Sequence, residues 1–290
     1  MRRTILFVFI LLTNSANGRA AVEDVPFKLH RNYLIVVRCS VADQTGLTAI
    51  VDTGTTETIL DTRVVKRLSL ATWADSVTSL TTDAAVRGVH IPDLQLGPIR
   101  VKKLEGIAID LAAMSRELGV RADVIIGVDV LRASNFLIDY EHQVMRFGVA
   151  SPLVYGTPLA PGARFALITL SVLGHPVRLQ VDTGFNGVLL YGKRLAWLQK
   201  YSGTRVVDAR ETAGGTRVAG VEQRSSVRSV DLSQVEVGNR LISHLMASVL
   251  DGAPRDFDGF DEAFDGLFGP RLLGSRRVAF DFDDRMLYWE

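Results

Sequence analysis

The stretch AIVDTGT at residues 49–55 has a second copy, LQVDTGF, at residues 179–185. In both places a short, largely apolar run leads to Asp-Thr-Gly, and another follows at residues 58–60 and 188–190. A single Asp-Thr-Gly is most simply a strand that ends in an Asp/Gly turn. Two copies in matching contexts indicate a chain that is built from two related halves.

The repeat extends beyond the tripeptide, because three further landmarks occur in the same order in both halves. They pair residues 89–97 with 230–238, 123–127 with 265–269, and 136–140 with 278–282. The offset between the halves is 130 residues at Asp-Thr-Gly, 141 at the next landmark and 142 at the last two. The second half therefore carries about eleven extra residues. We expect them within residues 208–228, where Ala213–Thr216 has the composition of a hairpin tip, either mobile or simply a solvated turn.

The N-terminus has the layout of an export signal. Two arginines precede an unbroken apolar run over residues 5–12, and small residues follow at positions 16, 18 and 20. Eight apolar residues are too few to span a bilayer, which needs roughly 20. We therefore predict a signal peptide at residues 1–20, a periplasmic or secreted protein, and no stable membrane anchor.

Composition and charge narrow the class of protein. The chain has 290 residues, 47% hydrophobic and 22% charged, with a formal net charge of +1. Loss of residues 1–18 removes two arginines, which leaves 31 basic and 32 acidic residues and a net charge of −1. This balance indicates no nucleic acid partner. The one cysteine, Cys39, cannot form an internal disulfide and is expected to be buried.

No metal or other cofactor is predicted. The five histidines are scattered, without the spacing of metal ligands, and they lie at positions 30, 90, 142, 175 and 244. The single glycine of the segment at residues 124–128 does not form a phosphate-binding pattern.

The pattern along the chain is mostly that of short strands. After the signal we expect an N-terminal lobe at residues 21–149, a proline-rich connector without periodicity at 150–164, and a C-terminal lobe at 165–290. Within the first lobe, residues 33–41 and 48–51 read as strands and residues 59–68 have a short helical spacing. Between residues 77 and 109 short strands with several turns are expected, and residues 111–118 read as a helix that Gly119 closes.

Two matching Asp loops have a chemical use if a pseudo-twofold axis brings them together. Gly54 and Gly184 would let main-chain N–H groups approach the carboxylates of Asp52 and Asp182. Two carboxyl groups at hydrogen-bonding distance cannot both ionise cheaply, so one keeps a proton. The ionised member can then take a proton from water while the protonated member polarises a carbonyl, which is metal-free hydrolysis of an amide. The coupling of two carboxyl groups is the property for which aspartic proteases are the standard example.

The paired motifs resemble those of the pepsin/retropepsin group of aspartic proteases. VDTGTT at residues 51–56 and VDTGFN at 181–186 are each followed by an apolar-apolar-Gly element, which is Ile125-Ile126-Gly127 in the first half and Leu267-Phe268-Gly269 in the second. The short lobes resemble the bacterial, retropepsin-like branch, with both halves fused in one chain. The resemblance covers nearly the whole chain after the signal.

This resemblance implies an all-β, bilobal fold of two pseudo-twofold-related, barrel-like lobes with a few short helices. It implies that Asp52 and Asp182 are the catalytic pair of an endopeptidase that hydrolyses peptide bonds through an activated water. Hairpin flaps, which we place near residues 82–88 and 213–220, would close over a peptide or protein substrate in extended conformation. A monomer would suffice for a complete active site. The residues that would support the active-site loops are Thr53, Gly54, Thr55, Thr183 and Gly184.

The two copies differ at the residue after Asp-Thr-Gly. Thr55 can donate a hydroxyl hydrogen bond to the Asp52 carboxylate, whereas its counterpart Phe185 cannot donate one to Asp182. Loss of a donor to the ionised form raises a carboxyl pKa, so we predict that Asp182 is the less acidic member and that activity extends into milder acid. The same difference also fits a second hypothesis, a catalytically inactive relative that binds peptides.

Overall fold

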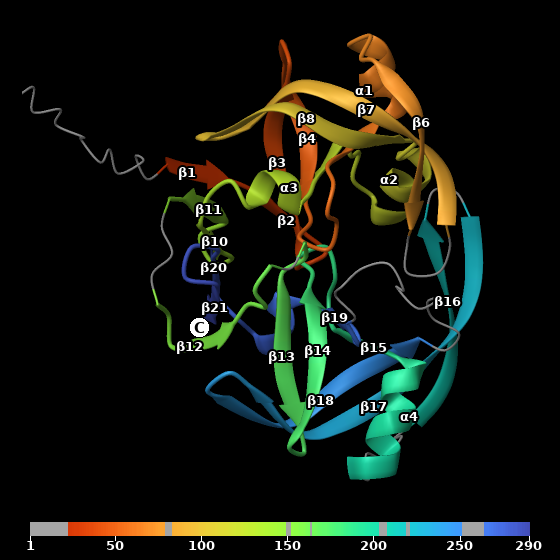
Figure 1. The fold of residues 1–290 in the computed structure, drawn as a ribbon, viewed down its shortest axis with the longest axis vertical. Helices are drawn as coiled ribbons and strands as arrows, with labels where there is room; N and C mark the ends of the chain where they lie inside the picture. Colours follow the sequence, from red (N-terminus) through yellow and green to blue (C-terminus); the bar gives the residue numbers. More distant parts are fainter. Residues whose placement is uncertain are drawn as a thin grey trace, which may run out of the picture.

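Two β-sheet lobes, stacked one above the other in Figure 1, are joined at one side by a sheet to which both halves contribute. The computed structural model describes residues 23–78, 83–148, 152–162, 164–202, 208–218, 221–250 and 264–290. The predicted signal peptide at residues 1–20 lies outside these ranges. No helix in the described ranges has the length and apolar character needed to cross a membrane.

The first lobe is an eight-stranded sheet with the order β2-β3-β4-β9-β5-β8-β7-β6. An additional pairing of β3 with β7 curls this sheet toward a barrel. Inward-facing apolar side chains of β3 alternate with more exposed ones, as expected for a strand with one face on a core. The strands are β2 (Lys28–His30), β3 (Leu34–Val41), β4 (Gln44–Val51), β5 (Ile59–Asp61), β6 (Thr72–Thr78), β7 (Asp83–Leu96), β8 (Ile99–Ile109) and β9 (Val124–Ile126).

The second lobe repeats this plan. Its order is β13-β14-β19-β15-β18-β17-β16, and β13 also pairs with β17 as β3 pairs with β7. The internal duplication of the sequence is therefore a duplication of topology. The strands are β13 (Leu167–Val172), β14 (His175–Val181), β15 (Val188–Tyr191), β16 (Asp208–Val218), β17 (Val221–Val237), β18 (Arg240–Leu250) and β19 (Gly266–Phe268).

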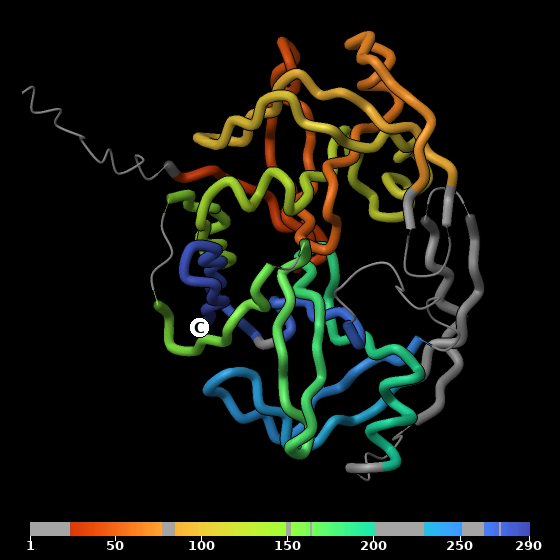
Figure 2. The backbone as a smooth tube through the Cα atoms, in the orientation of Figure 1, coloured from red at the N-terminus to blue at the C-terminus, as the bar shows by residue number. Residues whose placement is uncertain are grey.

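A six-stranded sheet with the order β1-β11-β10-β20-β21-β12 links the halves. Its centre is the antiparallel pair β10 and β20, and Figure 2 shows the blue C-terminal strands lying beside the green ones of the first half. Phe136 and Phe280 stack across this pair with ring centroids 4.8 Å apart, in the interior of the sheet. The strands are β1 (Glu23–Pro26), β10 (Phe136–Asp139), β11 (Val144–Phe147), β12 (Tyr155–Pro158), β20 (Arg277–Asp281) and β21 (Met286–Trp289).

Short helices complete the described structure. α2 ends at Gly119 as predicted, since this glycine has a φ of 75°, which favours glycine. Asp61 caps α1 by accepting a hydrogen bond from the backbone N–H of Arg63. Cys39 is buried, also as predicted. The helices are α1 (Thr62–Arg67), α2 (Ala112–Leu118), α3 (Val128–Leu131), α4 (Gly192–Ser202) and the 3₁₀ turn η1 (Pro270–Leu273).

Some local predictions for the first lobe were wrong. Within residues 77–109, where short strands with several turns were expected, residues 83–96 form one long strand, β7, which pairs with β6 on one side and β8 on the other. Residues 59–61 form a strand and not the start of a helix. The connector, expected to be without periodicity, contains the short strand β12, which pairs with β21.

The position of the extra residues in the second half was also wrong in part. α4 has 11 residues where its counterpart α1 has 6, so the helix takes a share of the insertion. Ala213–Thr216 is not a hairpin tip but the middle of β16, paired with residues 223–226 of β17. These two strands pair as far as Val218 and Val221, and residues 219–220 lie outside the described ranges.

Candidate active site

The two Asp-Thr-Gly loops meet where the lobes face each other. Asp52 follows β4 and Asp182 follows β14, and each of these strands runs parallel to a short partner, β9 or β19. The backbone N–H of Asp52 donates to the carbonyl of Ile126 (3.0 Å), and that of Asp182 donates to the carbonyl of Phe268 (2.9 Å). Each aspartate is therefore fixed at the carboxyl end of a buried parallel pair by the same backbone contact.

Threonine hydroxyl groups join the two loops. The Thr53 hydroxyl donates to the Val181 carbonyl (2.8 Å) and accepts from the Thr183 N–H (3.0 Å). The Thr183 hydroxyl in turn donates to the Val51 carbonyl (3.0 Å) and accepts from the Thr53 N–H (3.0 Å). Both side chains are buried, with 0% and 2% exposure. This reciprocal set of hydrogen bonds fixes the two loops relative to each other.

Each glycine of the motif packs against the aspartate of the opposite loop. A Cβ on Gly54 would overlap the Asp182 carboxyl group, and a Cβ on Gly184 would lie 3.0 Å from the Asp52 Cγ. Each glycine N–H also donates to the carboxylate of its own loop, from Gly54 to Asp52 and from Gly184 to Asp182, both at 2.7 Å. Glycine at these positions thus permits the close approach that the sequence predicted.

The carboxyl groups of Asp52 and Asp182 face each other closely enough for a side-chain hydrogen bond between them. Desolvation, followed by the charge of Asp52, raises the pKa of Asp182 well above its ordinary value. Desolvation also raises the pKa of Asp52, but hydrogen bonds from Asp182, Gly54 and Thr55 act in the opposite direction. Asp182 is therefore the member that holds the proton and Asp52 the member that ionises first.

The predicted reason for this asymmetry was wrong, although its direction agrees. The Thr55 hydroxyl does not reach Asp52 and donates instead to the carbonyl of Glu57 (3.1 Å). The backbone N–H groups of Thr55 and Phe185 donate in the same way to the main-chain carbonyls of Asp52 (3.5 Å) and Asp182 (3.3 Å), and each lowers the pKa of the carboxyl group beside it. Replacement of Thr by Phe therefore removes no donor from the second carboxylate.

The apolar-apolar-Gly elements lie directly behind the two loops. Ile125, Ile126 and Gly127 come at the end of β9, and Leu267, Phe268 and Gly269 at the end of β19. A Cβ on Gly127 would lie 2.9 Å from the Glu57 carbonyl carbon, and one on Gly269 would overlap the Phe185 carbonyl. Because both positions lack a Cβ, the segment that follows each aspartate can pass close to the backbone of Gly127 or Gly269.

Polar side chains that the sequence analysis did not identify also support the first loop. Asp129 at the start of α3 accepts from the Thr58 N–H and from the Thr58 hydroxyl, both at 2.8 Å. Gln180 donates from its side chain to the Gly54 carbonyl (2.8 Å). Comparison of the two copies could have identified Thr58 and Gln180, because each is a polar residue where the other copy has an apolar one. Thr58 corresponds to Val188, and Gln180 corresponds to Ile50.

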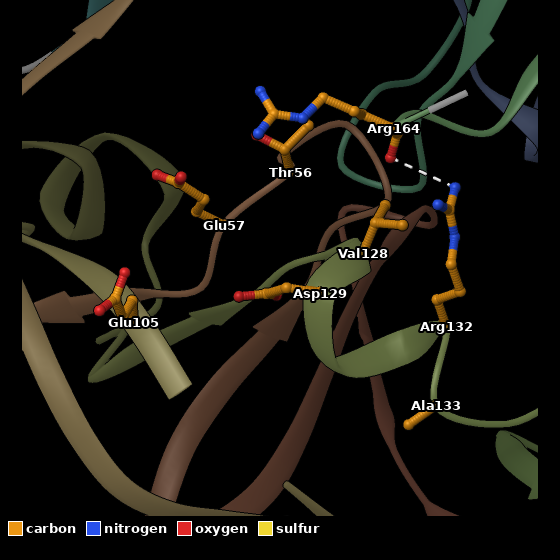
Figure 3. Close-up of a pocket in the computed structure, with 8 residues that line it drawn as sticks. All are labelled: Thr56, Glu57, Glu105, Val128, Asp129, Arg132, Ala133 and Arg164. Carbon is orange, nitrogen blue, oxygen red and sulfur yellow. Dashed lines mark hydrogen bonds between the residues drawn. The ribbon is translucent and has the colours of Figure 1, made fainter. Parts of the chain in front are cut away.

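A cavity of about 500 Å³ opens beside the first loop, between this loop and α3 (Figure 3). Its lining carries both signs of charge, because Glu57, Glu105 and Asp129 are joined there by Arg132 and by Arg164, whose side chain extends over Thr56 (Figure 3). The Arg132 guanidinium donates to the Arg164 carbonyl (3.3 Å), which ties α3 to the start of the second half. Thr56, Val128 and Ala133 complete the lining.

The predicted flap segments fall on two hairpins, β6–β7 and β16–β17. Residue 82 of the first segment and residues 219–220 of the second lie outside the described ranges. Their closure over a substrate stays a prediction. Within the described ranges, no group of three or more His, Cys, Asp or Glu side chains is arranged to hold a metal ion.

Comparison with known proteins agrees with this geometry. Residues 37–130 match the family model of aspartyl proteases, a segment that includes Asp52 and the element at residues 125–127. The structure is similar to the crystal structure of an aspartic proteinase from Irpex lacteus, with a TM-score of 0.51 and 15% identity over 92% of this chain and 96% of that one. A search of curated proteins found no match. The family match thus lies within the first lobe, and the similarity in fold to an aspartic proteinase extends over both lobes.

Proposed function

We propose that this protein is an exported aspartic endopeptidase that hydrolyses peptide bonds with a water activated by Asp52 and Asp182. The observation that carries the proposal is the meeting of the two cross-linked loops, which brings the carboxyl groups of Asp52 and Asp182, one from each half, together. Neither loop alone offers an acid and a base together. The pair does so without a metal.

The proposed reaction begins with a water held between the two carboxyl groups. Ionised Asp52 removes a proton from the water as its oxygen attacks the peptide carbonyl carbon, and protonated Asp182 donates to the carbonyl oxygen. The tetrahedral intermediate then collapses: the C–N bond breaks, the nitrogen takes the proton held by Asp52, and the hydroxyl proton returns to Asp182. The proton balance closes, and the pair returns to its starting state.

Backbone N–H groups support the roles assigned to the two aspartates. Gly54 and Thr55 stabilise Asp52 in its ionised form, which suits a general base. Desolvation keeps Asp182 protonated into milder acid, which suits a general acid. The cavity beside Thr56 and Glu57 offers space for substrate side chains on one side of the pair. An extended peptide is the substrate that such a position between two lobes accommodates.

The decisive experiment is cleavage of an unfolded protein across pH 3–8 by the purified protein without residues 1–20. We expect cleavage at internal peptide bonds by the wild type, inhibition by a statine-type inhibitor, and loss of at least about 1,000-fold in Asp52→Asn and Asp182→Asn. Inhibitor binding by both variants would show that they are folded. Equal activity of the wild type and Asp182→Asn would overturn the paired mechanism.

The inactive, peptide-binding alternative rested on Phe185. Its backbone N–H still supports Asp182, so this substitution leaves the second carboxylate with its hydrogen bonds. Binding of the statine-type inhibitor without any turnover between pH 3 and 8 would nevertheless establish the alternative.

Export is tested separately from catalysis. The basic start and the apolar run before residue 13 support it. Fusion of residues 1–20 to a reporter that acts only outside the cytoplasm should give signal, and replacement of two leucines in the run by arginine should abolish it. Reporter signal that is unaffected by these charges would contradict the proposed signal peptide.

A further inference from the structure

We propose that Gln180 is a positioning residue for the general base, acting from the second lobe on the loop that carries Asp52. The inference rests on the proposed endopeptidase activity and assigns a role to a residue outside both Asp-Thr-Gly motifs. It is carried by one contact across the lobe interface and by the difference between the two halves at this position.

The contact joins a buried side chain to the carbonyl of the motif glycine. Gln180 is 2% exposed, and its Nε2 donates to the Gly54 oxygen at 2.8 Å. The carbonyl can only accept, so the amide nitrogen must be the group that faces it. Gln180 lies two residues before Asp182, near the C-terminal end of β14. Its backbone is fixed there because β14 pairs with β13 on one side and β19 on the other.

This carbonyl belongs to the Gly54–Thr55 peptide unit, whose N–H donates to the main-chain carbonyl of Asp52 (3.5 Å) beside the Gly54 N–H that donates to its carboxylate (2.7 Å). The C=O of Gly54 and the N–H of Thr55 lie in one rigid plane and point in opposite directions. A donor on the carbonyl therefore fixes the direction of the N–H, and it also polarises that N–H as a donor. Thr55 N–H and Gly54 N–H both hold the pKa of Asp52 lower than desolvation alone would set it. Gln180 thus acts on Asp52 through the Gly54–Thr55 peptide.

The other half has no equivalent of this contact. The residue that corresponds to Gln180 is Ile50, which has no side-chain donor and packs in an apolar cluster with Leu34 and Ile125. The reciprocal threonine bonds hold both loops equally, so Gln180 adds a third restraint to the Asp52 loop only. The difference falls on the side of Asp52, the aspartate proposed as the general base.

The test compares the same side chain at the two corresponding positions. Gln180→Met keeps most of the volume and removes the donor, whereas Ile50→Met changes packing and removes no hydrogen bond. Gln180→Glu is a conservative variant whose carboxyl group can donate to Gly54 only while it is protonated. Each variant is measured as kcat and KM against pH, with a fluorogenic peptide derived from a cleavage site of the unfolded protein, after active sites are counted by inhibitor titration.

For Gln180→Met we expect kcat to fall about tenfold per titrated site, with little change in KM. The acid limb of its pH profile should move to higher pH, because Asp52 loses support for its ionised form. Ile50→Met should leave both limbs in place. Gln180→Glu should retain most activity at the acid end and lose it at lower pH than the wild type, since ionisation of Glu removes the donor and adds a charge.

The outcomes separate this inference from the function on which it rests. A wild-type protein that cleaves nothing overturns the proposed function, and the inference with it. An active wild type with an unmoved acid limb in Gln180→Met overturns the inference alone, because a merely structural role would lower the number of titrated sites and leave the limb in place. If Gln180→Met does not fold, the pH dependence of Gln180→Glu decides, and a profile equal to that of the wild type overturns the inference.

Discussion

Gly54 of the first loop lies against the carboxyl group of Asp182 from the second, so closely that the position has no room for a Cβ. Gly184 and Asp52 have the reciprocal relationship with more space, because a Cβ there would lie 3.0 Å from the Asp52 Cγ. The site should therefore tolerate a Cβ at position 184 better than one at position 54.

Gly54→Ala should displace the Asp182 carboxyl group and lower kcat/KM by about 100-fold or more, since small misplacements of reacting groups have effects of this size. Gly184→Ala should cause a clearly smaller loss, and it serves as the matched control. Steady-state kinetics per titrated site provide the comparison, with thermal unfolding to show that both variants are folded. Equal losses in the two variants would contradict this interpretation of the contact.

Thr53→Val should destabilise the protein although it preserves the shape of the side chain. It leaves the buried Thr183 N–H and the Val181 carbonyl without their partner, at a cost of about 2–4 kcal/mol in the free energy of unfolding. Thr53→Ser keeps the hydroxyl group and should cost about 1 kcal/mol for the lost methyl group. Urea unfolding measures both, and a valine variant as stable as the serine variant would mean that the cross-link contributes little.

Activity should be greatest in mild acid. Asp52 must be ionised, so activity falls as the pH drops through its pKa, and Asp182 must be protonated, so activity falls as the pH rises through its raised pKa. Because both pKa values are raised by desolvation, the window extends above that of an ordinary aspartate pair. The profile of kcat/KM against pH tests this expectation, and a profile confined below about pH 3.5 would contradict it.

Asp182→Asn should inactivate the enzyme and yet stabilise it at neutral pH. The pKa of Asp182 is raised in the folded protein, so its contribution to stability is fully present below the unfolded pKa of about 4 and is lost as the pH rises through the folded value. Asparagine cannot ionise and escapes this loss. Thermal unfolding should show a higher Tm than wild type at pH 7.5 and a smaller difference at pH 4, and a difference that does not depend on pH would be the contrary result.

Much of the site could be predicted because the chain repeats itself. The second copy turned a common tripeptide into a pair, and the pair predicted the meeting of the loops of Asp52 and Asp182, which the structure shows. The strand that leads into the first loop was also predicted, because residues 48–51 form a short run rich in β-branched and apolar residues, three of which are buried.

Other features depend on contacts that a linear pattern does not contain. Glycine is common in turns, but Gly88 lies within β7. The Trp73 side chain of the neighbouring strand packs against it, where a Cβ would overlap the ring. The Thr55 hydroxyl was assigned to Asp52 by proximity in sequence, whereas its geometry directs it to Glu57. Gln180 is a polar residue in a buried strand, and only its partner in the other lobe explains it. The assignment to a bacterial branch stays a prediction.

The pairing of β10 with β20 means that the connector is not the only link between the lobes. Backbone pairing joins the end of the first half to the end of the second, and the stacked rings of Phe136 and Phe280 lie within the same strand pair. A single proteolytic cut between β11 and β12 should therefore leave the two halves associated through this shared sheet, even though no covalent connection between them would remain.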